Sequence, residues 1–228
     1  MTPPLVSVVV PVLDEAATME LFLAELFGLP GRFEVIVVDG GSIDGTRELA
    51  VKAGAVLVDA PRGRAAQQNA GARAARGDVL VFLHADSRLP RDAYASLARA
   101  LDDPHVAGGN FSLRFDGDDA FSRVLGAWYA VQRRLGVWYG DSTIWVRPDV
   151  FWALGGFPSL PIMEDYALVR ALRRVGATPR LPGPATTSSR RWRALGVRPT
   201  VMSWVVIRWL FVAGVSPEWL ARLYRRAR

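Results

Sequence analysis

Two short stretches of the sequence hold side chains that could do chemistry. The stretch "VLVFLHAD" is an apolar run that ends in His84 and Asp86, and "MEDYALVRAL" places Glu164 and Asp165 before apolar positions at helical spacing. Carboxylates can ligate a divalent cation or take a proton from a hydroxyl group. Polar groups at the tip of a buried strand are costly unless they have partners. Both stretches indicate a site, although acids at a helix start also act as caps.

The elements that must position these groups alternate along the first hundred residues. Short apolar runs predict strands over Leu5–Val12, Phe33–Gly40, Ala55–Ala60 and Asp78–Asp86, and the patterns between and after them predict helices over Thr18–Leu29, Asp44–Ala53, Arg64–Arg76 and Arg91–Leu101. Strands that are apolar on both faces predict an α/β fold with a mostly parallel sheet and helices on both faces. Ligands of such sheets bind beyond the carboxyl ends of the strands.

Polar loops follow all four predicted strands. They read "PVLDEA", "DGGSIDGT", "PRGRAAQQNAGA" and "HADS", and Asp44 in the second is also a good helix cap. The sequence contains no P-loop, dinucleotide fingerprint or nucleophile elbow, and it has no cysteine and only two histidines. Acidic loops with glycine-rich turns suit Mg²⁺ or Mn²⁺, which in turn holds the phosphates of a substrate.

The charge of the chain is unevenly distributed. Residues 1–169 carry 15 basic and 21 acidic side chains, whereas residues 170–228 carry 13 arginines and one acid, Glu218. The basic end suggests an anionic partner: nucleic acid, phosphates or a lipid surface. Of these, nucleic acid is not among the partners that we expect. The absence of cysteine and of a signal-peptide pattern favours a cytoplasmic protein.

The apolar segment Val201–Val215 lies within this basic end. It is shorter than the roughly 20 apolar residues that span a bilayer, and it contains Arg208. Its tryptophans and the flanking arginines suit a helix that lies in the membrane interface. A buried helix packed on the sheet is the alternative, and both hold if one face packs while the other touches lipid.

Four segments together resemble a known family. They are "VSVVVPVLDEA", "EVIVVDGGSIDGT", "QQNAGARAARGDVLVFLHADS" and "GGFPSLPIMEDYALVRALRRVG". In this order, over residues 5–192, the chain is similar to family 2 glycosyltransferases with the GT-A fold, and most similar to short bacterial members with "HAD" in place of D-x-D. The resemblance implies a GT-A domain over residues 1–193, followed by a basic, tryptophan-rich helical segment over 194–228.

The resemblance also implies a donor side. Its residues would be Pro11, Glu15, Asp39, Asn69, His84, Asp86 and Arg191. Asp86 would bind Mg²⁺ or Mn²⁺ between the two phosphates of a nucleotide sugar, and His84 would contact ribose, phosphate or metal. Asp39 would accept a hydrogen bond from the base, which favours UDP and leaves GDP open. Gln68 stands where many members have arginine.

On the acceptor side the resemblance implies Asp165 as the general base of an inverting transfer. Glu164 would orient the acceptor, Asp141 would lie near it, and Trp192 would form a wall of its groove. Ser142 departs from a G-D-Q pattern. The glutamine that precedes R-W in processive members is missing, which argues against polymer synthesis.

Two other functions compete with the transferase. A sugar nucleotidyltransferase would carry a glycine-rich, arginine-containing loop after the first strand, where this chain has "PVLDEA". A catalytically silent nucleotide- or membrane-binding module would have no need for both Asp86 and Asp165. The sequence names neither the sugar nor the acceptor, which could be a hydroxyl or a carboxyl group, soluble or membrane-borne.

Overall fold

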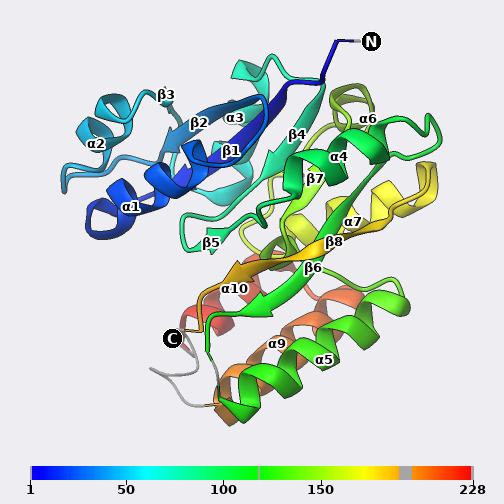
Figure 1. Ribbon diagram of the computed structural model, residues 1–228. Helices are drawn as coiled ribbons and strands as arrows, with labels where there is room; N and C mark the ends of the chain where they lie inside the picture. Colours follow the sequence, from blue (N-terminus) through cyan, green and yellow to red (C-terminus); the bar gives the residue numbers. More distant parts are fainter. Residues whose placement is uncertain (1, 118, 190–196, 227–228) are drawn as a thin grey trace.

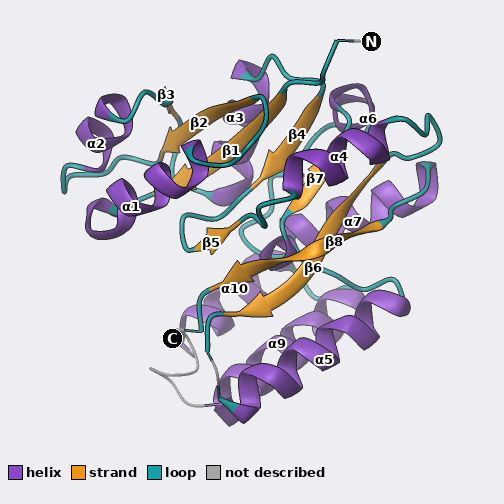
Figure 2. Cartoon of the chain, in the orientation of Figure 1, coloured by secondary structure: helices purple, strands orange, loops and turns teal. Residues whose placement is uncertain are grey.

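One mixed sheet organises the chain in this computed structural model, which describes residues 2–117, 119–189 and 197–226 (Figures 1 and 2). Its strand order is β3-β2-β1-β4-β7-β6-β8-β5. The strands are β1 Val6–Val12, β2 Phe33–Asp39, β3 Val56–Asp59, β4 Val79–Phe82, β5 Ser87–Arg88, β6 Gly108–Phe115, β7 Ile144–Val146 and β8 Arg180–Thr187. Strands β1 to β4 are parallel to one another, whereas β7 runs antiparallel to β4 and β6, and β5 antiparallel to β8.

Helices cover both faces of the sheet, as the sequence predicts. They are α1 Ala16–Phe27, α2 Thr46–Lys52, α3 Arg64–Ala74, α4 Ala93–Leu101, α5 Ala120–Arg134, α6 Pro148–Ala153, α7 Glu164–Val175, α9 Val197–Val212 and α10 Pro217–Arg226, with a short 3-10 turn, η1, over Gly140–Ser142. Helices α1 and α4 supply one apolar core, and α3, α6 and α7 supply the other. Strand β4 is apolar throughout, and β1 is apolar except for the buried Ser7, because both faces of these strands are covered.

The predicted strand Asp78–Asp86 is shorter in the structure. Strand β4 ends at Phe82, and the chain then turns, with the amide of Ser87 donating to the carbonyl of His84 at 3.0 Å. His84 and Asp86 therefore lie in a turn beyond the strand rather than on it. The apolar run continues to Leu83 because that side chain is still in the core.

Asp44 does not cap α2 in the predicted way. Gly45 is the N-cap residue, and the carboxylate of Asp44 instead accepts hydrogen bonds from the amides of Thr46 at 3.1 Å and Ala16 at 3.0 Å. Because Ala16 is the first residue of α1, Asp44 ties the starts of two helices together. It thereby fixes the loops that follow β1 and β2.

Helix α3 packs unusually close to the sheet at Gly71. A Cβ atom there would lie 2.4 Å from Cγ1 of Val9 and 2.7 Å from Cγ2 of Val38. Gly71→Ala is expected to lower the free energy of unfolding by about 1–3 kcal/mol, the usual scale for overpacking a core, as urea unfolding would measure.

Gly126→Ala on α5 is the matched control for this substitution. Its added Cβ atom meets only the carbonyl oxygen of Leu113, at 4.0 Å. The control should gain about 0.5–1 kcal/mol, because alanine is the better residue in a helix interior. If Gly71→Ala raised the free energy of unfolding as much as the control does, the close packing of α3 on the sheet would not be required for stability.

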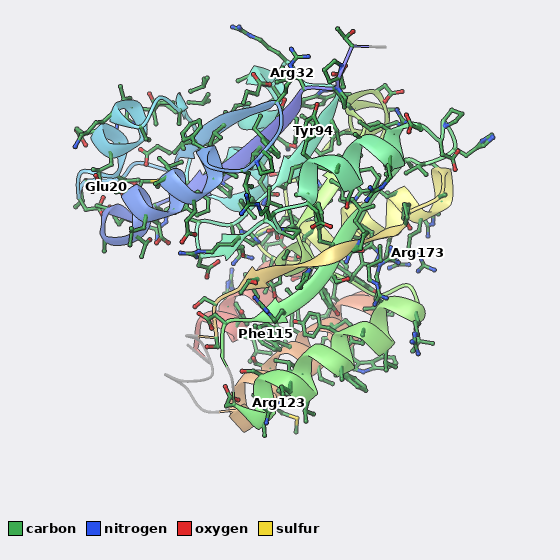
Figure 3. All side chains as sticks on the ribbon, in the orientation of Figure 1. Glu20, Arg32, Tyr94, Phe115, Arg123 and Arg173 are labelled. Atoms are coloured by element: carbon green, nitrogen blue, oxygen red, sulfur yellow. The ribbon has the colours of Figure 1, made fainter. Side chains whose placement is uncertain are left out.

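Helices α5, α9 and α10 form a layer beside β6 and β8 (Figures 1 and 2). Phe115 at the end of β6 (Figure 3) forms a cluster with Leu125 of α5, and Trp204 of α9 packs against it. Ile207 of α9 and Leu220 of α10 are buried against Met163 and Tyr166. One face of the predicted segment Val201–Val215 thus packs on the rest of the protein. This fits the buried helix and the helix with one packed face, both of which the sequence left open.

The opposite face of α9 is exposed, with Met202 and Trp209 at 65% and 60%. Within the described residues, none of the helices combines the length and the apolar character needed to cross a bilayer. The predicted boundary between residues 193 and 194 falls within 190–196, outside the described residues, so this division stays a prediction.

Candidate active site

The loops after β1 and β2 meet at Asp39. This carboxylate is 1% exposed and accepts hydrogen bonds from the amides of Gly41 and Ser42, each at 3.0 Å, and from Arg47 at 2.8 Å. Burial acts to raise the pKa of Asp39, but the hydrogen bonds from Ser42 and Arg47 outweigh it and hold the pKa below its ordinary value. Asp39 is therefore ionised, and a base N–H would share or replace one of these donors.

The other predicted residues of these loops lie close by. Pro11 is opposite Val38 in the register of β1 and β2, and the amide of Glu15 donates to the hydroxyl of Thr46 at 2.8 Å. Asp14 between them has a φ of 53°, a left-handed conformation that non-glycine residues rarely adopt. The structure thus brings Pro11, Glu15 and Asp39 to one edge, and their contacts with a nucleotide stay predictions.

Helix α3 carries two amides that position the loops around it. Buried Gln67 donates to the carbonyl oxygens of Val12 at 2.8 Å and Val38 at 2.9 Å, at the ends of two strands. Asn69 exchanges two hydrogen bonds with the backbone of Phe157, at 2.8 and 2.9 Å. Both the nitrogen and the oxygen of the Asn69 amide thus hold the loop that leads to α7. Neither takes part in the hydrogen bonds around Asp39. The role of Gln67 was missed from the sequence, and the nucleotide contact of Asn69 stays a prediction.

His84 and Asp165 come together across Gly140. The amide of Gly140 donates to Oδ2 of Asp165 at 2.8 Å. A Cβ atom on Gly140 would lie 3.2 Å from this oxygen and 3.2 Å from Nε2 of His84, so any side chain there would press on both groups. Two neighbouring residues, Thr143 and Met163, also have left-handed φ values, of 56° and 67°. Such strain is commonly found at functional sites, because surrounding structure must hold it in place.

Arg64, the first residue of α3, faces the acids of this region. Desolvation of the guanidinium acts to lower the pKa of Arg64, although the residue as a whole is exposed, but its interactions with Glu164, Asp165 and Asp141 raise the pKa above its usual value. Sequence reasoning did not assign a role to Arg64. The available signal was its place in the loop after the third strand, at the edge where the other polar loops gather.

Two neighbouring groups have shifted proton affinities. Burial lowers the pKa of His84 to about 4, and the positive charge of Arg64 acts in the same direction, so the imidazole is neutral at pH 7. Burial and the charge of Asp165 raise the pKa of Glu164 to about 7. Glu164 is 4% exposed, so its carboxyl group keeps its proton up to about neutral pH.

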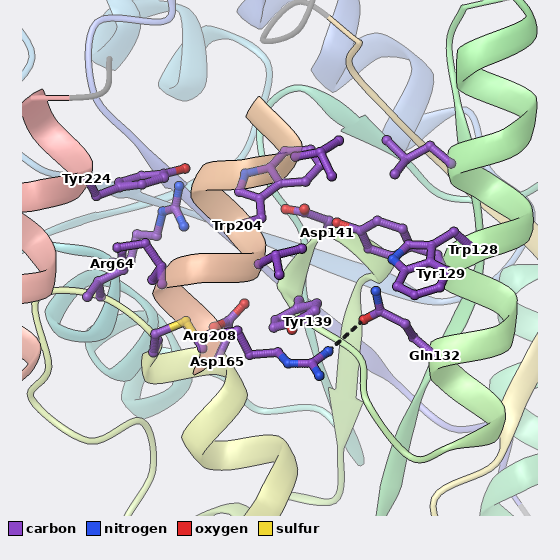
Figure 4. Close-up of a pocket in the computed structure, with 16 residues that line it drawn as sticks. Arg64, Trp128, Tyr129, Gln132, Tyr139, Asp141, Asp165, Trp204, Arg208 and Tyr224 are labelled. Atoms are coloured by element: carbon purple, nitrogen blue, oxygen red, sulfur yellow. Dashed lines mark hydrogen bonds between the residues drawn. The ribbon is translucent and has the colours of Figure 1, made fainter. Parts of the chain in front are cut away.

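An open pocket of about 130 Å³ adjoins these groups (Figure 4). Asp165, Asp141 and Arg64 line it together with residues from α5, α9 and α10. Arg208 of α9 and Gln132 of α5 are joined across it by a 3.4 Å hydrogen bond. The remaining wall is apolar or aromatic: Leu125, Trp128, Tyr129, Tyr139, Ile162, Met163, Val201, Trp204, Val205, Ile207 and Tyr224.

The structure therefore gathers the predicted acids Asp141, Glu164 and Asp165 around Arg64, and the charges of Asp86 and Asp165 act on His84. It adds wall residues that the sequence did not reveal, since α5 showed no chemical motif. The predicted donor residue Arg191 and the predicted wall residue Trp192 lie outside the described residues.

The fit of a divalent cation depends on Asp86. Among the described residues no three histidines, cysteines or acids form a group that could hold a metal by themselves. Mg²⁺ is commonly held by one or two carboxylates together with substrate phosphates. The half-buried carboxylate of Asp86, in the turn after β4, fits such a site. It does not fit a metal enclosed by protein alone.

A mixed sheet with acidic side chains at the carboxyl ends of its parallel strands defines an α/β domain of the kind that binds its ligands at this edge. Residues 7–154 match the family model "Glycosyl transferase family 2", and the chain belongs to this family. The family predicted from the sequence is thereby confirmed.

Curated relatives match parts of the chain. The "Undecaprenyl-phosphate 4-deoxy-4-formamido-L-arabinose transferase" of Aeromonas hydrophila is 35% identical over 108 residues, which are 42% of this chain and 33% of that protein. "Glycosyltransferase AglE" of Haloferax volcanii is 26% identical over 177 residues, covering 69% and 57% of the two chains. The chain thus spans less than two thirds of the length of these relatives.

Solved structures share the fold. A mannosyltransferase from Pyrobaculum calidifontis, in complex with GDP-Man and Mn²⁺, superposes with a TM-score of 0.67 at 21% identity, over 100% of this chain and 70% of that one. Glucosyl-3-phosphoglycerate synthase from Mycobacterium tuberculosis, in complex with Mn²⁺, UDP and glucosyl-3-phosphoglycerate, gives 0.59 at 22% identity, over 88% and 79%. The predicted GT-A fold is confirmed.

Proposed function

We propose that the protein is an inverting, divalent-metal-dependent glycosyltransferase. It moves a sugar from a nucleotide-sugar donor, with UDP favoured over GDP, to a hydroxyl or carboxyl acceptor. One observation carries the proposal: Asp165 and His84 meet across Gly140, where the carboxyl edge of the sheet adjoins the pocket. A donor at that edge and an acceptor in the pocket would place their reacting atoms beside Asp165.

Asp165 is assigned the proton transfer. The hydrogen bond from the amide of Gly140 fixes the orientation of its carboxylate, and the side chain lines the pocket. An acceptor hydroxyl within about 3 Å would give its proton to Asp165 as its oxygen attacks the anomeric carbon. Attack from the pocket, opposite the departing nucleoside diphosphate, inverts the configuration of that carbon.

The donor side is assigned to the strand-end loops. Asp39 would accept from the base, and the neutral ring of His84 would donate a hydrogen bond to ribose or phosphate. Asp86 would hold Mg²⁺ or Mn²⁺, which offsets negative charge on the departing diphosphate. The assignments of Arg191 to the diphosphate and Trp192 to the acceptor wall remain predictions from sequence.

The pocket favours an acceptor with an apolar part next to a polar head. Its apolar and aromatic wall suits the former, and Arg64, Arg208 and Asp141 suit the latter. The name of the Aeromonas relative includes undecaprenyl-phosphate, a phosphate on a long polyprenyl chain. We therefore propose a membrane-borne acceptor, with the protein in the cytoplasm and bound peripherally at the inner face of the cell membrane.

A thermal-shift screen of nucleotide sugars with and without Mn²⁺ or Mg²⁺ tests this function. At about 100 times Kd, the correct donor should raise Tm by about 5–10 °C, and only when metal is present. Donors that bind are then assayed for release of nucleoside diphosphate. A protein that binds no nucleotide sugar and releases no diphosphate from any of them would not be a glycosyltransferase.

A further inference from the structure

Helix α5 exposes an apolar stripe. The stripe consists of Val124, Trp128 and Val131 on the helix and Leu135 just beyond its last residue, and these side chains are 46–73% exposed. Their spacing of four, three and four residues places them on one face. The other face of α5 packs on β6 through the cluster around Phe115. Apolar side chains at helical spacing on a solvent-facing surface are typical of an interaction site.

Helix α9 exposes a second stripe. It consists of Met202, Val205, Val206, Trp209 and Val212, which are 38–65% exposed. The two helices contact each other through Trp204 and the Arg208–Gln132 hydrogen bond, and Figures 1 and 2 show them side by side. We call the two stripes together the docking face: Val124, Trp128, Val131, Leu135, Met202, Val205, Val206, Trp209 and Val212.

The docking face is continuous with the mouth of the pocket. Trp128 of α5 and Val205 of α9 are exposed members of the two stripes, and both also line the pocket. The pocket therefore opens between the stripes. A molecule that reaches Asp165 through this opening must cross the apolar surface.

The charged side chains on the two helices of the docking face are arginines. The sequences of α5 and α9 contain no acid, and exposed Arg123 and Arg134 stand near the two ends of α5 (Arg123 in Figure 3). Asp119 precedes α5, and its carboxylate is engaged with the amide of Ser122 at 2.8 Å. An apolar face with exposed tryptophans and an arginine rim complements the headgroup region of an anionic bilayer.

We propose that the docking face binds the surface of a bilayer that contains anionic lipid. Trp128 and Trp209 lie at headgroup level, the aliphatic members insert between them, and arginines contact the lipid phosphates. This orientation turns the mouth of the pocket toward the membrane. The acceptor then enters between α5 and α9 without leaving the lipid, a consequence that rests on the proposed function; the binding of lipid does not.

Co-sedimentation with vesicles of phosphatidylglycerol and phosphatidylcholine tests the docking face. Leu135→Gln/Trp209→Gln removes one exposed apolar side chain from each stripe and leaves the buried residues unchanged. Leu21→Gln/Val51→Gln is the matched control, because these side chains are exposed on α1 and α2, outside the docking face. At low salt the docking-face variant should bind vesicles at least about tenfold more weakly than wild type. The control should bind as wild type does, and high salt should weaken the vesicle binding of both.

Three outcomes would overturn the proposal. In the first, wild type does not pellet with anionic vesicles at low salt. In the second, the docking-face variant and the control bind equally. In the third, wild type is a dimer and the docking-face variant a monomer, so that a second copy covers the face. Release of nucleoside diphosphate from the donor is measured in parallel. If wild type binds vesicles but releases no nucleoside diphosphate, the proposed function alone is rejected. If the docking-face variant still releases nucleoside diphosphate, its fold is intact.

Discussion

Asp165→Asn is expected to lower the rate of sugar transfer by about 10²–10⁴-fold, the scale for loss of a general base. The amide keeps the shape of the carboxylate, and its oxygen can still accept the hydrogen bond from Gly140. It cannot take the proton of the acceptor hydroxyl. Donor affinity should therefore stay at the wild-type value, so the loss should appear in kcat, measured with saturating donor and acceptor.

Glu164→Gln is the matched control, one residue away. The raised pKa of Glu164, about 7, means that its carboxyl group is mostly protonated at pH 6, and glutamine resembles this neutral form. The control should therefore transfer sugar at close to the wild-type rate at pH 6. If Asp165→Asn were as active as wild type, the base would lie elsewhere, and Asp141 in the pocket would be the next residue to test.

Asp86→Ala is expected to abolish the metal-dependent part of nucleoside diphosphate binding. Even loss of a group that only supports a metal ligand commonly costs 10–100-fold in affinity, so loss of the proposed ligand should cost about 100-fold or more. The fold should persist, because Asp86 lies in a turn beyond the end of β4. Calorimetric titration of UDP or GDP, with Mn²⁺ and with a chelator, measures the effect.

Asp149→Ala is the control for this titration. Asp149 is an exposed acid at the start of α6, which follows β7. Because β7 runs antiparallel to β4, the end of β7 lies at the opposite edge of the sheet from Asp86. This variant should bind the nucleotide with Mn²⁺ as wild type does. Equal affinity of Asp86→Ala and wild type in the presence of Mn²⁺ would remove the metal assignment.

The sequence by itself determined the sheet and the edge at which the site lies. Strands β1, β2 and β4 are mostly apolar on both faces, with Ser7, Glu34 and Asp39 as exceptions, and such a pattern is typical of strands covered on both sides, so their runs predicted parallel pairing. Parallel pairing puts the carboxyl ends of the strands together. For this reason Asp39 and Asp86 could be assigned to one edge before any contact was known.

Only the tertiary structure brought His84 to Asp165, and it did so through Gly140. Residues from three distant segments meet there, and no local pattern encodes such a contact. The same holds for Arg64: its place at the start of α3 put it at this edge, but nothing in the sequence indicated that it would face three acids. The turn after β4 was likewise not predicted from the sequence, because Leu83 extends the apolar run past Phe82, the last residue of the strand.

The outward face of α5 shows the limit most clearly. Val124, Trp128, Val131 and Leu135 follow the period that a helix uses to bury one face, and by sequence alone such a stripe indicates core. In the structure they are exposed, and the neighbouring face with Leu125 and Tyr129 packs on β6. The period of a helix determines which residues share a face, but whether that face is buried depends on which elements pack against it.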